Sequence, residues 1–66
     1  MRLKDLLQLV DYDKPIVLAS MRFKDGEPKE RSKNQDGSWN DIKEYLYWHV
    51  VGISTTVGGY LYIEIL

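Results

Sequence analysis

The fold is decided by the stretch Val50–Leu66, which reads VVGISTTVGGYLYIEIL. Gly58 and Gly59 lie between two runs rich in β-branched and aromatic residues, and a Gly-Gly pair in this setting is a strong signal of a β-hairpin. Alternate residues of the second run are apolar, so we expect one face of that strand to pack on the core; these residues are Leu61, Ile63 and Ile65.

The first strand of this hairpin has an irregular apolar pattern. Val50 and Ile53 are both apolar, but in a regular strand they would lie on opposite faces because side chains alternate. Gly52 stands between them, and a glycine inside a strand often marks a β-bulge, in which one extra residue shifts the alternation. We therefore expect a bulge at Gly52.

The region before the hairpin combines a charged segment with a short helical pattern. Trp39, Ile42 and Leu46 recur at helical spacing after Ser38, a suitable N-cap, so we expect a helix from about Trp39 to Leu46. Residues 24–38 (KDGEPKERSKNQDGS) have no apolar periodicity and contain Asp-Gly turn signals and a proline. Their opposite charges cancel, so we interpret them as a solvated loop rather than a phosphate-binding arm.

The N-terminal part of the chain predicts a helix over residues 2–10. Its apolar residues form one stripe of such a helix: Leu3, Leu6, Leu7 and Val10. The following Asp11-Tyr12-Asp13-Lys14-Pro15 ends it, because proline does not continue a helix.

The next run, Ile16–Phe23 (IVLASMRF), has the composition of a strand. We assign its inner face to Val17, Ala19, Met21 and Phe23, and its outer face to Ile16, Leu18, Ser20 and Arg22. The order of elements then predicts an α+β fold, a small antiparallel sheet of about three strands with two short helices on one face. No repeat or linker divides the chain, so we expect residues 1–66 to form a single domain.

The small size of the chain limits its core. A domain of about 60 residues buries only about 60% of the surface that its unfolded chain exposes, so further stabilisation is expected. The 66 residues include no cysteine and one histidine, which excludes disulfides and argues against a zinc site. We expect no metal and no cofactor, and the remaining source of stability is a homo-oligomer.

The charge and hydrophobicity of the chain argue against two further classes of protein, nucleic-acid binders and membrane proteins. Nine basic and ten acidic side chains give a net charge of −1, whereas a nucleic-acid binder carries a basic excess on one face, so we expect no DNA or RNA partner. No segment approaches the ~20 apolar residues of a membrane span, and the first residues lack the apolar run of a signal peptide. We expect a cytoplasmic protein with no membrane partner.

No stretch of the sequence contains a motif that identifies a catalytic reaction. The imidazole of His49 is a candidate general base, but a general base needs a nucleophile and an orienting group that the sequence does not mark, which favours a structural or interface role. Asp11 and Asp13 could hold a cation, yet a calcium loop would require Gly and Glu where Ile16 and Arg22 stand. We interpret the aspartates as turn residues and do not expect an enzyme.

The two ends of the chain carry a recognisable pattern. A KDLL segment (Lys4–Leu7) opens it, and V-x-x-I, a short turn and L-x-I-x-I close it. This pattern resembles very short proteins encoded by phages and prophages of Gram-positive bacteria. Most of these have no known activity, and some of this size block bacterial immunity by binding a defence protein or its nucleotide signal. The resemblance implies a binding protein in the cytoplasm of the host bacterium and brings no catalytic residues.

The candidate interface is the face of the sheet turned away from the helices. Exposed apolar patches usually mark interfaces, where Tyr and Trp are enriched. We assign to this face Tyr60, Tyr62, Leu18 and Arg22, rimmed by Tyr47, Trp48 and His49. In the alternative interpretation, some of these rings fold over the edge of the sheet and complete the core.

Two functions follow from this interface. The first is a protein-binding module, a homo-oligomer that inhibits a host defence protein by occupying its surface. The alternative is a small-molecule binder that holds a nucleotide-like signal between subunits, with rings stacked on the base and Arg2, Arg22 or Arg31 on phosphate. The slightly negative net charge favours a protein partner.

Overall fold

The computed structural model describes residues 1–9, 14–39 and 41–66. The elements in chain order are α1 (Leu3–Leu9), β1 (Ile16–Ala19), β2 (Lys29–Arg31), the short 3-10 helix η1 (Lys43–Tyr45), β3 (Val50–Thr55) and β4 (Leu61–Ile65). The first helix is confirmed within its described part. The predicted helix end at Val10 and the Asp11 and Asp13 turn lie outside the described residues.

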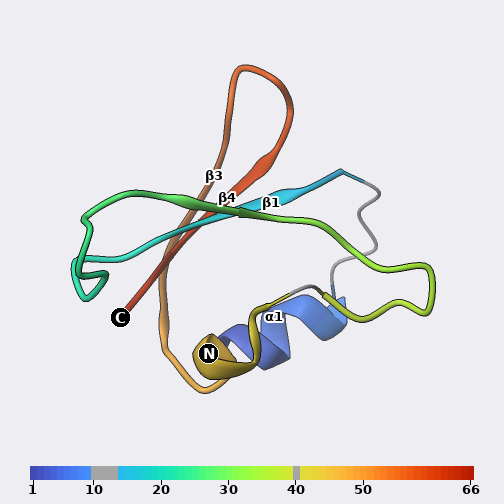
Figure 1. The fold of residues 1–66 in the computed structure, drawn as a ribbon, viewed down its shortest axis with the longest axis horizontal. Helices are drawn as coiled ribbons and strands as arrows, with labels where there is room; N and C mark the ends of the chain where they lie inside the picture. Colours follow the sequence, from blue (N-terminus) through green and yellow to red (C-terminus); the bar gives the residue numbers. More distant parts are fainter. Residues whose placement is uncertain (10–13, 40) are drawn as a thin grey trace.

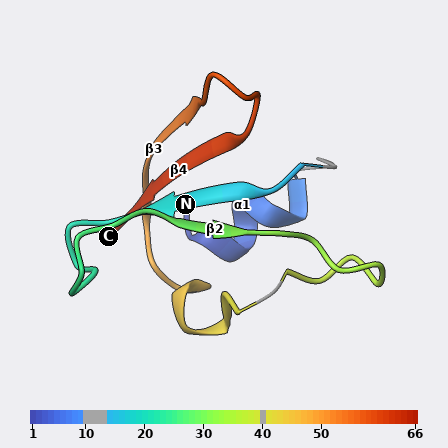
Figure 2. The ribbon, with the colours of Figure 1, turned by 45° about the horizontal axis from the view of Figure 1, so that its top comes forward.

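Within the described ranges, the strands form a single 4-stranded sheet in the order β2-β1-β4-β3 (Figure 1). The central strands β1 and β4 are parallel, and each outer strand is antiparallel to its neighbour. Turned by 45°, the strands follow one another across the sheet with α1 on one side (Figure 2). The α+β class is confirmed. The sheet is mixed and has one strand more than the predicted antiparallel sheet.

The C-terminal hairpin forms as its sequence predicts. The backbone N–H of Thr56 donates to the carbonyl oxygen of Tyr60 at 2.9 Å, and Gly59 adopts the left-handed φ of 80° that its turn requires. The pairing register of β3 and β4 shifts between Val50 and Gly52, which confirms the bulge. Ile63 and Ile65 are buried, as their alternation predicts.

The predicted parity of β1 is wrong. Ile16 and Leu18 are fully buried, whereas they were assigned to the outer face. Parallel pairing sets Ile16 opposite Leu61 and Leu18 opposite Ile63, and directly paired residues share a face of the sheet. Both faces of IVLA are apolar, so the register with β4, rather than the hydrophobicity of β1, decides which face is buried.

β1 is also shorter than predicted. It ends at Ala19, and the N–H of Phe23 donates to the carbonyl oxygen of Ser20 at 3.3 Å, which closes a turn. The turn breaks the alternation, so Met21, assigned to the inner face, is 95% exposed. Phe23 is buried, as predicted, but it reaches the core from the turn and not from a strand.

The second predicted helix, 39–46, is reduced to η1. Asp41 has a φ of 52°, in the left-handed region, which interrupts a right-handed helix ahead of Ile42. Trp39 forms an isolated β-bridge with Lys33. Ser38 is not a helix cap, because its N–H and hydroxyl both donate to the Asp36 carboxylate, at 2.9 and 2.6 Å.

The segment 24–38 is mostly exposed, but it also contains β2, which the charged sequence did not indicate. β2 pairs with β1 through Arg31 opposite Ile16 and Lys29 opposite Leu18. Strand formation here follows from the open edge of β1, which supplies backbone partners irrespective of the side chains of β2. The interpretation of residues 24–38 as a solvated loop is therefore wrong at Lys29–Arg31, which form a strand of the sheet.

The core lies between the sheet and the layer formed by α1 and η1. Its buried members are Leu3, Leu6, Ile16, Leu18, Phe23, Ile42, Tyr45, Ile63 and Ile65. Backbone hydrogen bonds tie α1 to the chain that follows η1: Leu3 N–H donates to the Trp48 carbonyl and Lys4 N–H to that of Leu46, both at 2.9 Å. The opposite face of the sheet carries alternate strand residues such as Val17, Tyr62 and Glu64.

Candidate functional site

The structure places the predicted interface aromatics on two different sides of the sheet. Trp48 packs against the core on the helix side, where its ring centroid lies 5.1 Å from that of Tyr45 and 5.8 Å from that of Phe23. Tyr62 alternates with the buried Ile63, so it lies on the opposite face. Trp48 and Tyr62 are therefore not brought together, and Trp48 follows the alternative interpretation of a ring that completes the core.

Arg22 joins the Trp48 side. Its guanidinium carbon Cζ lies 3.8 Å from the centroid of the Trp48 ring, a cation–π geometry. Because β1 ends at Ala19, the alternation that assigned Arg22 to the outer face does not extend to it. One face of the Trp48 ring is thus covered by this chain's own arginine.

A second cation flanks the same aromatic cluster. Lys29 Nζ lies 5.1 Å from the Phe23 ring centroid and 2.9 Å from Asp25 Oδ2. The hydrogen bond from Lys29 lowers the pKa of the Asp25 carboxyl, and the same bond raises the pKa of Lys29. Burial in the cluster raises the pKa of the Tyr45 phenol. The cluster is internally satisfied, which makes it a structural feature of this corner.

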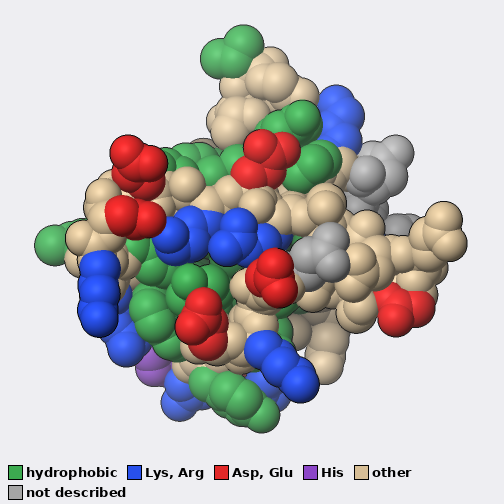
Figure 3. Space-filling view, viewed as in Figure 1, with side chains coloured by type: hydrophobic (Ala, Val, Ile, Leu, Met, Phe, Trp, Pro, Cys, Tyr) green, Lys and Arg blue, Asp and Glu red, His purple; other side chains and the backbone are tan. Residues whose placement is uncertain are grey.

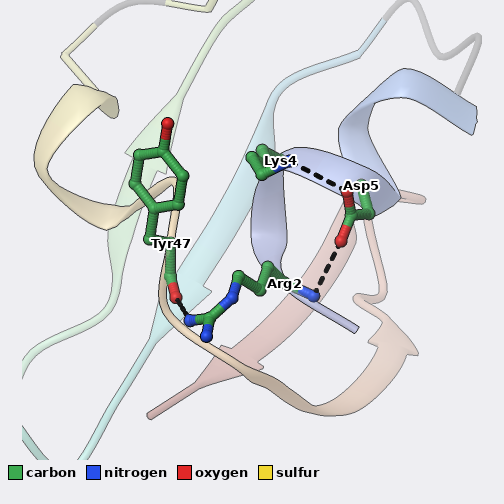
Figure 4. A network of polar contacts seen from close by, with 4 residues as sticks. All are labelled: Arg2, Lys4, Asp5 and Tyr47. Carbon is green, nitrogen blue, oxygen red and sulfur yellow. Dashed lines mark hydrogen bonds and ion pairs between the residues drawn. The ribbon is translucent and has the colours of Figure 1, made fainter.

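The side chains of Tyr47 and His49 are exposed. Figure 4 shows Arg2 reaching Tyr47, with Lys4 and Asp5 of α1 beside it. The Arg2 guanidinium donates to the Tyr47 carbonyl oxygen, and the Arg2 N–H donates to Asp5 Oδ2 at 3.3 Å. The hydrogen bond from the Arg2 N–H is the largest cause that lowers the pKa of the Asp5 carboxyl, and the hydrogen bond from Lys4 is the second. His49 exchanges backbone hydrogen bonds with Leu66 at 3.0 and 2.9 Å. Among these contacts, the Arg2 guanidinium bond joins the residue before α1 to the segment that leads into β3.

The remaining predicted site residues, Leu18 and Tyr60, also lie in different parts of the structure. Leu18 is a core residue and cannot contribute to a surface without unfolding. Tyr60 is half-buried at the hairpin turn, where its N–H donates to Thr56 Oγ1 at 3.0 Å. The predicted site therefore combines core, turn and surface residues.

Sequence reasoning missed a groove of about 860 Å³ between α1 and the segment around η1. The apolar side chains that line it are Leu7, Leu9, Trp39, Ile42 and Leu46. Three lysines, Lys4, Lys33 and Lys43, and the carboxylate of Asp41 stand among its lining residues, giving this part of the surface a positive balance. The face drawn in Figure 3 carries hydrophobic side chains among both basic and acidic ones.

A sequence signal for this groove existed but could not be interpreted alone. Leu7 and Leu9 point to different sides of a helix, so one short helix presents apolar residues on more than its core face. Leu9 is 75% exposed, and Leu7 is only partly buried. Lys33 and Lys43 are far from α1 in the sequence and reach the groove only through the fold.

No protein-family model, curated protein or solved structure matches this chain. No helix in the described part of the chain is both long and apolar enough to cross a membrane. Within residues 1–9, 14–39 and 41–66, no group of His, Cys, Asp or Glu side chains is arranged to hold a metal ion.

Proposed function

We propose that this chain is a non-enzymatic binding protein that acts by occupying the surface of another protein, and that the groove beside α1 is its contact site. The observation that carries the proposal is a lining that combines apolar side chains with three lysines, Lys4, Lys33 and Lys43, which we call the lysine rim. Apolar lining supplies contact area, and the lysines supply charge complementarity and orientation.

The partner segment that fits this groove is an acidic amphipathic helix. A helix in a groove buries apolar side chains at i, i+3 or i+4 and i+7, and its flanking residues meet the rim. Here the rim contains Lys33, whose Nζ lies 6.0 Å from the Trp39 ring centroid, and the exposed Lys43 of η1. Glu and Asp on the partner would pair with these ammonium groups.

The phage resemblance suggests where such a partner is found. A short protein that blocks bacterial immunity must act in the cytoplasm of its host, and occupation of a defence protein's surface needs no catalysis. We therefore propose a host defence protein as the partner, and a homo-oligomer as the form that binds it. Oligomer formation raises apparent affinity when two sites engage one target.

The test begins with a photo-crosslinking amino acid placed in the groove. Leu9 and Met21 are both exposed, and only Leu9 lines the groove, so Met21 is the matched control position. Expressed in a Gram-positive host, the probe at Leu9 should crosslink one protein through an acidic segment, and the probe at Met21 should not. The same protein captured equally from both positions would contradict the groove as the contact site.

The purified partner then permits a charge test. The double change Lys33→Glu and Lys43→Glu should weaken binding at least tenfold in calorimetry, because two attractive contacts become repulsive. The double change Lys14→Glu and Lys24→Glu alters net charge equally at residues that do not line the groove, and should have little effect. Equal losses from both pairs would show that only net charge matters.

The same groove favours a second candidate, a nucleotide-like anion. Trp39 offers a ring for a base, and Lys33 and Lys43 offer charge for phosphate. Calorimetry with mono-, di- and cyclic nucleotides separates the two candidates: micromolar binding that is lost in Lys33→Ala would favour this one. Arg22→Ala should leave such binding unchanged, because Arg22 stacks on Trp48 away from this groove.

A further inference from the structure

β3 is an edge strand whose outer side is covered only at its beginning. The N–H of Val50 donates to the Met1 carbonyl oxygen at 2.8 Å, and Arg2 forms an isolated bridge with His49. From Val51 to Thr55, no described residue pairs with the outer side of the strand. Figure 1 shows this part of β3 extending with β4 beyond the rest of the sheet.

The backbone direction along this stretch follows from the hairpin register. Thr56 donates to Tyr60, so Thr56 faces β4, and alternate residues of an antiparallel strand face the same side. Ser54, opposite Tyr62, therefore also faces β4. Ile53 and Thr55 turn their N–H and C=O groups outward, where they can accept another strand.

The side chains of this edge carry no charge. The stretch Val50–Gly59, VVGISTTVGG, contains no Asp, Glu, Lys, Arg or Pro. Val51 is 58% exposed and Ile53 is 52% exposed. The hairpin tip, at the top of Figure 3, also ends in hydrophobic atoms. Natural proteins protect free strand edges with charges or proline, and an unprotected apolar edge pairs with another chain.

The opposite edge of the same sheet is protected. β2 consists of Lys29, Glu30 and Arg31 and is preceded by Pro28. It is short and fully charged, which are two of the devices that stop strands from adding. The two edges differ in the way expected if β2 remains an outer edge and β3 does not.

We propose that β3 pairs with β3 of a second copy of this chain, antiparallel and about a two-fold axis beside Ile53. The axis lies there because Met1 covers the strand before Val51 and the turn follows Thr55, so Ile53 is the middle of the free stretch. In such a pair each Ile53 faces its counterpart and exchanges backbone hydrogen bonds with it.

A second copy fits this edge better than an unrelated strand for two reasons. Two copies of the uncharged β3 can pair without like-charge repulsion. Two copies of the charged β2 would repel each other. Pairing about a two-fold axis also closes the assembly, because the joined sheet, β2-β1-β4-β3-β3-β4-β1-β2, ends on two protected edges. The assembly therefore stops at a dimer. This inference is independent of the groove, which is formed by other residues.

The contact is small, so the dimer should be weak. One short strand pair buries less than the ~1,200 Å² typical of stable interfaces, which places the expected dissociation constant in the micromolar range. Sedimentation equilibrium from about 5 µM to about 500 µM should show monomer converting to dimer, a range that brackets such an affinity. A monomer throughout, or assemblies larger than a dimer, would overturn the proposal.

The variants that test the axis are Ile53→Lys and Ile53→Glu. Each alone should be monomeric, because two like charges would oppose each other at the axis, while the half-exposed side chain leaves folding intact. An equal mixture of the two variants should recover the dimer, because the opposed charges then attract. Val57→Lys is the control with the same change of charge outside the strand, and should dimerise as the unaltered chain does. Dimers of unchanged affinity in Ile53→Lys would refute the proposal.

Hydrogen exchange on the unaltered chain gives a test that needs no variant. The amides of Ile53 and Thr55 should exchange fast at low protein concentration and at least tenfold more slowly at high concentration. The Ser54 amide, which faces β4, should be protected at both. Concentration-independent exchange at Ile53 in a chain that dimerises would place the interface elsewhere.

Discussion

At the residue scale, Leu18 is predicted on the outer face of the sheet but lies in the core. Strand alternation alone permits either face of IVLA to be buried, and the pairing of Leu18 with Ile63 selects the one that holds Leu18. Its neighbour Val17 lies on the opposite face, opposite Tyr62. The two residues therefore provide a direct experimental check of the parity of β1.

We predict that Leu18→Ala lowers the free energy of unfolding by about 2–5 kcal/mol, the usual cost of a large-to-small change in a core. Val17→Ala should cost much less, because Val17 is only partly buried. Urea unfolding followed by circular dichroism measures both. A larger loss for Val17→Ala than for Leu18→Ala would mean that the other face of β1 is buried.

At the element scale, the β3–β4 hairpin is the part that local sequence specifies best. The two glycines of its turn, Gly58 and Gly59, have different backbone conformations, so substitutions can test them separately. Gly59 has a left-handed φ of 80°, whereas Gly58 does not adopt a positive φ, and the nearest atom to an added Cβ there is Thr56 Oγ1 at 3.9 Å. Only Gly59 requires the absence of a side chain.

Gly59→Ala should therefore destabilise the protein by about 1–2 kcal/mol, the cost of a left-handed conformation for a residue with a Cβ. Gly58→Ala should be neutral or slightly stabilising, since it reduces the freedom of the unfolded chain. Thermal unfolding of the two variants side by side gives the comparison. Equal losses would show that the turn has a different geometry.

At the scale of the whole molecule, several surface carboxylates couple stability to pH. Asp5, Asp25 and Asp36 have lowered pKa values, caused mainly by hydrogen bonds from the Arg2 N–H, the Lys29 ammonium and the Ser38 hydroxyl. A carboxyl whose pKa is lower in the folded state than in the unfolded state stabilises the fold above its unfolded pKa. That contribution is lost as the pH falls through the folded pKa.

We predict that the free energy of unfolding decreases as the pH falls below the ordinary carboxyl pKa of 3.8, because these carboxylates then become protonated. Asp25→Asn should make this decrease shallower, because one titrating group is removed. Urea midpoints between about pH 2 and pH 7, a range that includes the ordinary pKa of an Asp carboxyl, measure the effect. An identical pH profile for Asp25→Asn would remove the Lys29 bond as a source of the coupling.

Interactions close in sequence determined the helix at the N-terminus, the C-terminal hairpin, the bulge at Gly52 and the α+β class. Each depends on neighbouring residues: the spacing of Leu3 and Leu6 within α1, or the glycines between two apolar runs. For these elements the local preference and the final fold agree, so the pattern was sufficient.

Only the tertiary structure decided the parallel pairing of β1 with β4, the strand β2 and the burial of Leu18. It also brought Lys33 and Lys43 to α1 and left the outer side of β3 open. The physical reason is that these features depend on contacts between segments that are far apart in the sequence. IVLA is apolar on both faces and KER has no apolar pattern, so backbone pairing and core burial by the rest of the chain determine their structure.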